Sequence, residues 1–336
     1  MTVRALIMTA GLGTRLRPLT YIRAKAAVPV NGETLARRAV GWLVSHGITD
    51  MVLNLHYRPE SIASSVGDGS DMGARVRYTW EQPVLGSAGG PRRALPLLVD
   101  RSPLAGPFRP AAVPHQGGSD TFVIVNGDTL TDVDLAAMAR RHAESGALVT
   151  MALIPNPRPE TYGGVLLDDR GMVSRFTRAG VARESYHFIG VQFAEARVFA
   201  ELADGVPSES VNALYPVLIR RDPESVAAFV CNARFQDIGT PADYLRTSIH
   251  LAREEGDRLT AGRNVRIADS AVLRSTAVWD DVVIGPRARL TDCVVADGAQ
   301  IPADADYERC VIVPAAGRPG GAAERVEDGL LIAALD

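Results

Sequence analysis

A seventeen-residue repeat near the end of the chain restricts the fold more than any other feature of the sequence. Between residues 265 and 312, apolar residues recur at a step of seventeen, and inside each repeat they follow one another at steps of six and five. The recurring sets are Ile267, Ile284 and Ile301, then Leu273, Leu290 and Tyr307, then Val278, Val295 and Ile312. Short strands at this near-hexapeptide spacing are typical of a left-handed parallel β-helix, in which each coil buries its apolar residues against the next. The repeat therefore predicts about three coils, which we place in residues 256–317.

The cysteines fit a packing role better than a disulfide framework. Cys293 and Cys310 share the seventeen-residue step, so we expect them to stack as small residues of the β-helix core. Together with Cys231 they make an odd number and form no C-x-x-C pair, which favours a reducing, cytoplasmic setting. The residues after the repeat, 318–336, end in an apolar run and are predicted to dock as a strand or a helix.

The strongest chemical motif lies at the other end of the chain, in residues 8–29, which read MTAGLGTRLRPLTYIRAKAAVP. It follows a short apolar run at residues 3–8 that predicts one buried strand. Gly11 and Gly13 let the backbone bend sharply and approach a ligand, and Arg15 adds a cation beside the exposed N–H groups. Lys25 can reach back over the same turn. These residue types in this order predict a polyphosphate site, although the third glycine of a dinucleotide fingerprint is missing.

Alternating strand and helix patterns through the first half of the chain predict an α/β fold. Strands are expected at 50–55 and 76–80, with helices at 33–46 and 59–66. Such alternation implies a parallel sheet that binds ligands at the carboxyl ends of its strands. A second glycine-rich segment, EQPVLGSAGG at residues 81–90, is predicted to form a loop there, ahead of a helix from about residue 91.

Two aspartates follow predicted strands. Asp128 ends the sequence Asn126-Gly127-Asp128 after an apolar strand at 121–125, and Asp237 stands before a helix that Thr240 would cap. A carboxylate at a strand end clears the sheet edge and can bind a metal ion. The alternative for Asp128 is that it caps a helix beginning near residue 132.

Together these motifs resemble the sugar-1-phosphate nucleotidyltransferases, also called NDP-sugar pyrophosphorylases. The matching patterns are G-x-G-T-R-x-x-P-x-T, E-x-x-P-L-G-T-A-G, N-G-D and D-x-G-T-P-x-D-Y, and the likeness is closest to mannose-1-phosphate guanylyltransferase-like members with a C-terminal hexapeptide-repeat β-helix. The resemblance implies a Rossmann-like, mostly parallel sheet of the GT-A-like type, followed by the short left-handed parallel β-helix. We therefore expect a catalytic domain at 1–255, the β-helix at 256–317 and a tail at 318–336.

The resemblance also implies an activity: a sugar 1-phosphate attacks the α-phosphorus of a nucleoside triphosphate and pyrophosphate leaves, with Mg²⁺ as cofactor. The implied catalytic residues are Arg15, Lys25 and Asp128, and the implied metal ligands are Asp128 and Asp237. The implied nucleotide-binding residues are Ala10, Gly11, Leu12, Gly13, Thr14, Arg15, Glu81, Gln82, Gly86, Ser87, Ala88, Asn126 and Gly127. The implied sugar-phosphate-binding residues are Lys25, Tyr162, Gly163, Gly164, Gly190 and Phe235.

The substrate pair is less constrained than the reaction. The G-S-A-G sequence at residues 86–89 favours GTP with mannose 1-phosphate or a related manno-configured sugar such as a heptose phosphate. A Glu-Lys-Pro motif of the family is replaced by the sequence at 176–179, which keeps a uridylyl- or thymidylyltransferase acting on another sugar 1-phosphate open. Ala26 likewise replaces the proline that usually follows the lysine.

Other classes fit less well. A net charge of -3 argues against a nucleic-acid partner, and no apolar run approaches the roughly 20 residues that cross a bilayer. Acyl transfer by a hexapeptide-repeat protein would use a histidine in the coils, where none occurs beyond His250. A regulatory subunit that senses nucleotide sugars would be expected to have lost the cations or the carboxylates.

Two expectations concern the molecule as a whole. Because β-helix coils commonly pack against another copy, we expect a homo-oligomer. The Pro-, Gly- and Ala-rich segment at 100–120 shows no periodicity and is predicted to be a surface insertion.

Overall fold

The computed structural model describes residues 3–99, 120–182, 184–256, 261–318, 320–321 and 324–335. Most of the predicted insertion at 100–120 lies outside these residues. The chain divides into two compact units. The sheet unit comprises Met1–Gly11, Arg38–Pro59 and Val66–Phe235, and the β-helix unit comprises Leu12–Arg37, Glu60–Ser65 and Gln236–Asp336. The predicted domain division at residues 255 and 317 stays a prediction.

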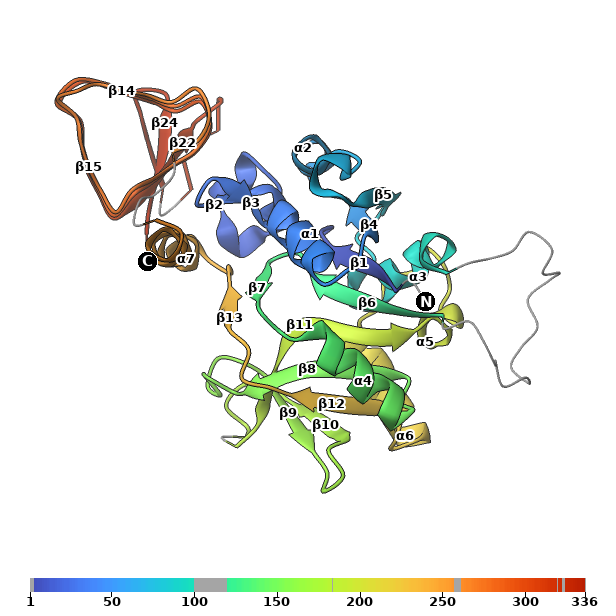
Figure 1. The fold of residues 1–336 in the computed structure, drawn as a ribbon. Helices are drawn as coiled ribbons and strands as arrows, with labels where there is room; N and C mark the ends of the chain where they lie inside the picture. The colour runs from blue at the N-terminus through green and yellow to red at the C-terminus, as the bar shows by residue number, and fades with distance from the viewer. Residues whose placement is uncertain are drawn as a thin grey trace. The chain divides into compact units, whose positions relative to one another are not determined.

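A nine-stranded sheet organises the first unit (Figure 1). Its centre is the parallel set β6-β1-β4-β5, in register at pairs such as Leu6 with Val52 and Leu6 with Ile124, and β12 is parallel to β8. The mostly parallel α/β sheet is thus confirmed, with β9, β10 and β11 as antiparallel additions. The strands are β1 (Arg4–Met8), β4 (Asp50–Leu55), β5 (Arg75–Trp80), β6 (Thr121–Asn126), β8 (Val149–Pro155), β9 (Gly164–Leu167), β10 (Val173–Thr177), β11 (Tyr186–Glu195) and β12 (Val226–Val230), with the short β7 (Thr129–Thr131) between β6 and α4.

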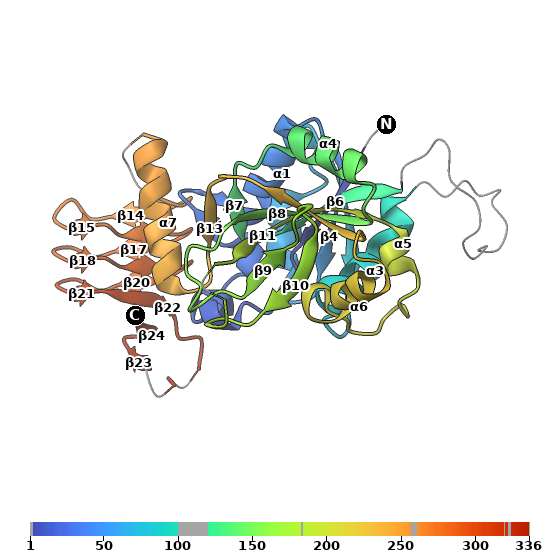
Figure 2. The same cartoon turned by 90° about the horizontal axis from the view of Figure 1, so that it is seen from below.

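Helices cover both faces of this sheet (Figure 2). On one face of the sheet, strand residues such as Leu6 and Met151 pack with α3 in one apolar core. On the other face, the hydroxyl of Thr150 forms a hydrogen bond with His142 of α4. The helix predicted to begin near residue 132 is α4, and Asp134 caps it: its side chain accepts from the N–H of Ala137. The helices are α1 (Leu35–Ser45), α2 (Pro59–Val66), α3 (Gly86–Leu98), α4 (Leu135–Ser145), α5 (Arg197–Ala200), a π-turn (Ser210–Leu214) and α6 (Tyr215–Arg221), with a 3₁₀ turn at Ser70–Met72.

The second glycine-rich segment forms the start of α3, which corrects the predicted loop. The helix begins at Gly86 rather than about residue 91. Glycine and proline disfavour helices, but here tight packing overrides their propensity. A Cβ at Gly89 would lie 2.8 Å from the carbonyl oxygen of Val206, and one at Gly90 would lie 2.8 Å from Glu81 Oε1. Close packing, rather than loop flexibility, therefore explains these two glycines.

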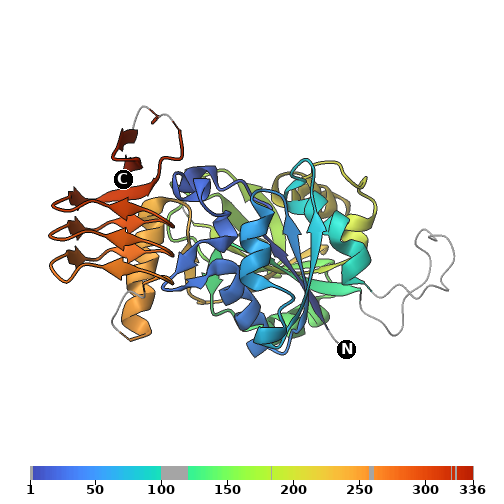
Figure 3. The ribbon, with the colours of Figure 1, turned by 90° about the horizontal axis from the view of Figure 1, so that it is seen from above.

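The repeat folds as predicted into a short parallel β-helix. Its sheets pair strands seventeen residues apart, so Ile267, Ile284 and Ile301 stand in register. Figure 1 shows the coils end-on, and Figure 3 shows the three layers from the side. The sheets are β14 (Arg266–Ile267), β17 (Val283–Ile284) and β20 (Gln300–Ile301); β15 (Val272–Arg274), β18 (Arg289–Thr291) and β21 (Asp306–Glu308); and β16 (Ala277–Val278), β19 (Val294–Val295) and β22 (Cys310–Pro314).

The C-terminal residues extend the β-helix as a hairpin. β24 (Leu330–Ala334) pairs antiparallel with β22, and β23 (Glu324–Glu327) pairs with β24. Of the two predicted alternatives for the C-terminal residues, a strand or a helix, the strand is therefore correct. Inside the coils Cys293 and Cys310 are buried with their sulfurs 3.7 Å apart, which confirms that they stack.

The rest of the β-helix unit consists of short elements and one long helix. Residues 33–34, predicted to begin a helix, instead form β3 (Glu33–Thr34) with β2 (Pro29–Val30), and α1 starts at Leu35. The remaining elements are three 3₁₀ turns (Thr14–Leu16, Leu19–Tyr21 and Lys25–Ala27), β13 (Phe235–Asp237), whose last two residues belong to this unit, and α7 (Pro241–Glu254).

Candidate active site

The signature segment, residues 12–29, folds back on itself beside Gly13. Gly13 has φ +60°, and a Cβ there would lie 2.8 Å from Thr20 Cγ2 and 3.0 Å from Lys25 Cβ. The hydroxyl of Thr20 donates to the carbonyl of Gly13 at 3.0 Å and fixes the turn. Only glycine fits a left-handed, crowded position of this kind. The fold thus brings the base of the Lys25 side chain against the glycine turn.

Two cations and a carboxylate converge in the β-helix unit. Lys25 Nζ lies 4.0 Å from Asp237 Oδ1, and both side chains are largely buried. Gly239 stands between the carboxylate and Arg15, since a Cβ there would lie 3.2 Å from Asp237 Oδ2 and 3.3 Å from Arg15 Nη1. Lys25 is also the only lysine of the chain, among 36 lysines and arginines. An ammonium is a compact point charge, whereas a guanidinium is a planar fork, so the two cations are not interchangeable.

A capping box fixes the carboxylate of this cluster. Thr240 Oγ1 accepts from the N–H of Asp243 at 3.1 Å, and the N–H of Thr240 donates to the Asp243 carboxylate at 3.1 Å. Pro241 occupies the first turn of α7, as predicted. The rigid start of this helix sets the position of Asp237, three residues before the cap.

Asp128 lies at the carboxyl edge of the sheet unit. The N–H of Gly127 donates to the carbonyl of Met8 at 2.9 Å, and a Cβ on Gly127 would lie 2.7 Å from that oxygen. The segment after β6 therefore runs directly against the end of β1. Since Asp134 caps α4, the alternative that Asp128 is a helix cap is wrong.

A buried polar network joins the end of β1 to the second glycine-rich segment. Asn54 Oδ1 accepts from the N–H of Thr9 at 2.6 Å, and Asn54 Nδ2 donates to Glu81 Oε1 at 2.6 Å. The other oxygen of Glu81 accepts from the N–H of Leu85 at 2.7 Å. Asn54 and Glu81 are both fully buried. Glu81 thus positions the backbone before α3, while its predicted contact with the nucleotide stays a prediction.

Sequence reasoning missed Asn54. The feature that could have indicated it is a single amide side chain within the apolar strand DMVLNL. Replacing Asn54 by leucine should lower the free energy of unfolding by about 2–4 kcal/mol, because it leaves Glu81 and the N–H of Thr9 without their partner. Urea denaturation would measure the loss. In a double-mutant cycle with Glu81→Leu the two losses should not add, and fully additive losses would contradict the network.

Ser87 and the backbone around it contact the segment before the π-turn. Its hydroxyl donates to Glu209 Oε2 at 2.7 Å and accepts from the N–H of Ser210 at 2.8 Å. The N–H of Ala88 donates to the carbonyl of Ser208 at 2.9 Å. Gln82, by contrast, is exposed and can reach a ligand. Of the two implied nucleotide-binding residues Ser87 and Gln82, Gln82 is thus the more accessible.

An aromatic cluster joins two of the predicted sugar-site residues, Tyr162 and Phe235, through His187. The rings of Tyr162 and His187 stack at 4.3 Å, and His187 lies 4.9 Å from Phe235. The guanidinium of Arg158 covers the Tyr162 ring at 4.7 Å. His187 was missed by sequence reasoning, although it is the one histidine in the apolar strand YHFIGVQF.

The glycines of this region adjoin the cluster or the sheet edge. Gly163 precedes β9, and at Gly164 a Cβ would lie 2.6 Å from Ser185 Oγ. Gly190 has φ +79° where the register of β11 shifts, and a Cβ there would lie 2.8 Å from Asn126 Nδ2. Gly190 therefore contacts the residue two positions before Asp128.

The position of His187 leads to a pH-dependent stability. Burial lowers the pKa of His187 from 6.5 to about 4 and outweighs a hydrogen bond with the Gly163 backbone. Between these values the unfolded chain binds a proton at this position and the folded chain does not, so stability falls as the pH drops from 6.5 to about 4. We expect a loss of about 1–2 kcal/mol across this window, after allowing for the ring's partial exposure.

Chemical denaturation at a series of pH values tests this expectation. His187→Asn should show a flatter dependence than the wild type between pH 6.5 and about 4. Identical curves would show that His187 does not titrate as described.

The predicted site residues are shared between the two units. The β-helix unit holds Leu12, Gly13, Thr14, Arg15, Lys25 and Asp237. The sheet unit holds Ala10, Gly11, Glu81, Gln82, Gly86, Ser87, Ala88, Asn126, Gly127, Asp128, Tyr162, Gly163, Gly164, Gly190 and Phe235.

The two strand-end aspartates offer the oxygen donors that Mg²⁺ prefers. Asp128 is half-buried, and Asp237 has most of its side chain covered. Within the described ranges no three His, Cys, Asp or Glu side chains cluster closely enough to hold an ion by themselves. Mg²⁺ is usually bound through one or two carboxylates together with substrate phosphates and water, so each of these aspartates is a suitable type of ligand for that ion. The magnesium site stays a prediction.

A glycine turn that carries cations after the first strand of a mostly parallel α/β sheet, with carboxylates at strand ends, is typical of nucleotide-binding transferases. Residues 4–254 match the model of the Nucleotidyl transferase family, and the chain belongs to this family. Among the residues that the structure describes, no helix is both long and apolar enough to span a bilayer.

Named relatives cover most of the chain. A mannose-1-phosphate guanylyltransferase of Mycobacterium tuberculosis is 26% identical over 91% of this chain and 83% of its own length. A UTP–glucose-1-phosphate uridylyltransferase of Synechocystis is 25% identical over 94% of this chain and 85% of its own. The crystal structure of HddC from Yersinia pseudotuberculosis shares the fold, with a TM-score of 0.60 and 20% identity over 74% of this chain and 100% of HddC.

Proposed function

We propose that this protein joins a nucleoside triphosphate to a sugar 1-phosphate, with GTP and mannose 1-phosphate or a related manno-configured sugar phosphate as the substrates. The observation that carries the proposal is the convergence of Arg15, Lys25 and Asp237 beside the Gly13 turn. Both reactants are anions, so a site for this reaction needs fixed positive charge and alignment more than an acid or a base.

Each residue of the cluster has a role in this proposal. The backbone N–H groups from Leu12 to Thr14, with Arg15, would bind the β- and γ-phosphates that leave as pyrophosphate. Lys25 would contact the α-phosphate and the attacking sugar phosphate, which holds two mutually repelling anions in line. Asp128 and Asp237 would hold Mg²⁺, which supplies neutralisation of the charge that develops on the phosphates.

The aromatic cluster offers a surface for the sugar. Tyr162, His187 and Phe235 present apolar ring faces, and the half-buried Tyr162 and His187 keep polar atoms that can select hydroxyl groups. In this proposal the cluster takes over sugar selection from the missing Glu-Lys-Pro motif.

The guanylyl assignment has two supports. One is the G-S-A-G sequence of residues 86–89, and the other is the mannose-1-phosphate guanylyltransferase among the relatives. The uridylyltransferase among them keeps UTP as the second candidate.

Pyrophosphate release with Mg²⁺ tests the proposal directly. The protein would be incubated with GTP, UTP, dTTP, CTP or ATP, each paired with mannose, glucose, N-acetylglucosamine or heptose 1-phosphate. We expect the largest kcat/KM for GTP with a manno-configured sugar. A different productive pair would overturn the substrate assignment. No release with any pair, together with tight binding of a nucleotide sugar, would favour a regulatory subunit.

A further inference from the structure

The signature segment contains a second arginine whose side chain is held by the β-helix. Arg23 lies two residues before Lys25, and its guanidinium is largely buried. Its Nε donates to Asp297 Oδ2 at 2.6 Å and its Nη2 donates to Asp297 Oδ1 at 2.7 Å. The same Nη2 donates to Asp280 Oδ2 at 2.8 Å. Bidentate pairs of this kind fix orientation as well as position.

The two aspartates are themselves fixed by the repeat. They stand seventeen residues apart, at equivalent positions of successive coils, and the N–H of Asp280 donates to Asp297 Oδ1 at 3.0 Å. Asp280 also accepts from the N–H and the guanidinium of Arg263, which occupies the same position one coil earlier. The β-helix therefore presents a rigid pair of carboxylates to Arg23.

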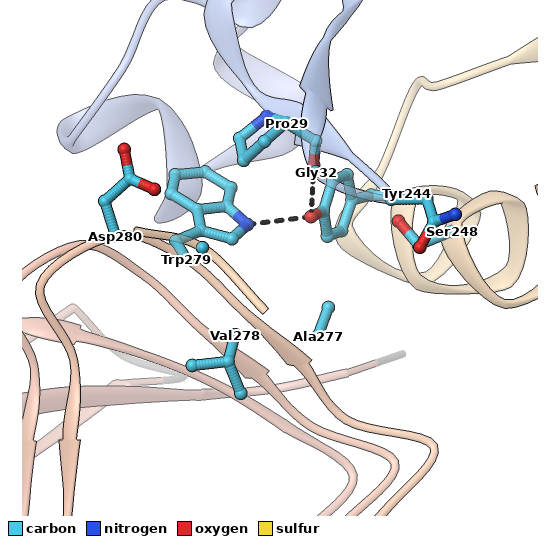
Figure 4. Close-up of a pocket in the computed structure, with 10 residues that line it drawn as sticks. Pro29, Gly32, Tyr244, Ser248, Ala277, Val278, Trp279 and Asp280 are labelled. Carbon is cyan, nitrogen blue, oxygen red and sulfur yellow. Dashed lines mark hydrogen bonds between the residues drawn. The ribbon is translucent and has the colours of Figure 1, made fainter. Parts of the chain in front are cut away.

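A second anchor lies on the other side of Lys25. The carbonyl of Pro29 accepts from the hydroxyl of Tyr244 on α7 at 2.5 Å, and that hydroxyl accepts from Trp279 Nε1 at 2.7 Å (Figure 4). The Tyr244 and Trp279 side chains are almost fully buried. The backbone from Arg23 to Pro29 is thus held at both ends by contacts that reach the coils after α7.

We infer that Asp297 and Asp280 are positioning residues for Lys25: the coil carboxylates hold the signature segment so that its ammonium stands beside Asp237. The expected effect of these residues on catalysis rests on the proposed function. The inference gives the β-helix a part in the site, because Arg23, two residues before Lys25, is fixed by coils more than 250 positions away along the chain.

The chain offers a matched control for this pair. Arg287 and Asp304 form another bidentate pair of the β-helix, with two bonds of 2.6 Å and the same seventeen-residue separation found between Asp280 and Asp297. Both side chains are more than half exposed and lie away from the signature segment. Asp304→Asn therefore removes a similar charge from the coils without touching Arg23.

Asp297→Asn should raise the KM for the sugar 1-phosphate about tenfold and change the KM for the nucleoside triphosphate less than threefold, since small misplacements of a positioning group are costly. Asp304→Asn should change neither by more than twofold. A loss of folded protein alone lowers the apparent kcat and leaves KM unchanged, so the KM values separate positioning from simple destabilisation. Equal KM values in the two variants would overturn the inference.

Labelling of the only lysine gives a readout that needs no activity. The rate of acetylation of Lys25, followed by mass spectrometry of its peptide, should rise several-fold in Asp297→Asn and stay at the wild-type value in Asp304→Asn. Equal rates in all three proteins would overturn the inference. If the wild type released no pyrophosphate with any substrate pair, the proposed function would fail, while the labelling rates would still decide whether the coils position Lys25.

Discussion

Lys25→Ala should lower kcat/KM for pyrophosphate release by about a thousandfold, the upper part of the range for removing one group that stabilises developing charge. The ammonium stands 4.0 Å from Asp237 and beside the glycine turn, and no second lysine exists to replace it. We expect kcat to fall and the KM for the sugar 1-phosphate to rise, because Lys25 is proposed to bind the phosphates in both the ground state and the transition state.

Steady-state kinetics of three variants would check this expectation. Arg289→Ala removes one exposed cation from the β-helix and should stay within twofold of the wild type. Lys25→Arg keeps the charge but replaces a point by a planar fork, so it should recover only part of the loss. Wild-type kinetics in Lys25→Ala would remove this residue from the mechanism.

Asp128→Asn should abolish most turnover, with kcat reduced by about a hundredfold or more, because a neutral amide is a poor ligand for a hard divalent cation. The fold should be unchanged, since Asp128 lies just beyond β6, caps no helix and is replaced by a side chain of the same shape. The Mg²⁺ concentration for half-maximal rate should rise in the same variant.

A titration of the rate with Mg²⁺, alongside thermal unfolding, separates these effects. Asp169→Asn removes an exposed carboxylate of the same unit and should leave both the rate and the Mg²⁺ dependence unchanged. Near-wild-type turnover of Asp128→Asn would exclude this carboxylate from the reaction.

Much of the fold could be predicted because its signals are local or periodic. The β-helix follows from a fixed step that stacks like residues such as Ile284 and Ile301, and α7 follows from a cap, a proline and an acidic residue within four positions. The predicted start of α3 was wrong because it depends on contacts with residues that are distant in the sequence. Propensity disfavours Gly-rich helices, and only the packing of residues 206–210 against Gly86 and Gly89 reverses it.

The sequence predicted which residue types form the candidate site, but not which other residues hold them in place. The glycines and cations that we propose to bind phosphate stand in one short motif, so they can be recognised in the sequence. Asn54 and His187 are single polar residues in apolar strands, and nothing local shows which partners they meet. The contact between Arg23 and Asp297 spans 274 positions, so no pattern in the signature segment indicates that the coils hold it.

The antiparallel strand β24 limits how copies of this protein can join edge to edge. A parallel β-helix leaves its last coil with open N–H and C=O groups that could template another strand, and here β24 occupies those of β22. The new edge, β23, carries Glu324, Arg325 and Glu327, which discourage further addition. At the opposite end the first coil exposes Ile267 and Val272. Within the described residues of the β-helix unit, addition of another copy to β22 is therefore blocked, whereas β20 and β21 still end their own sheets.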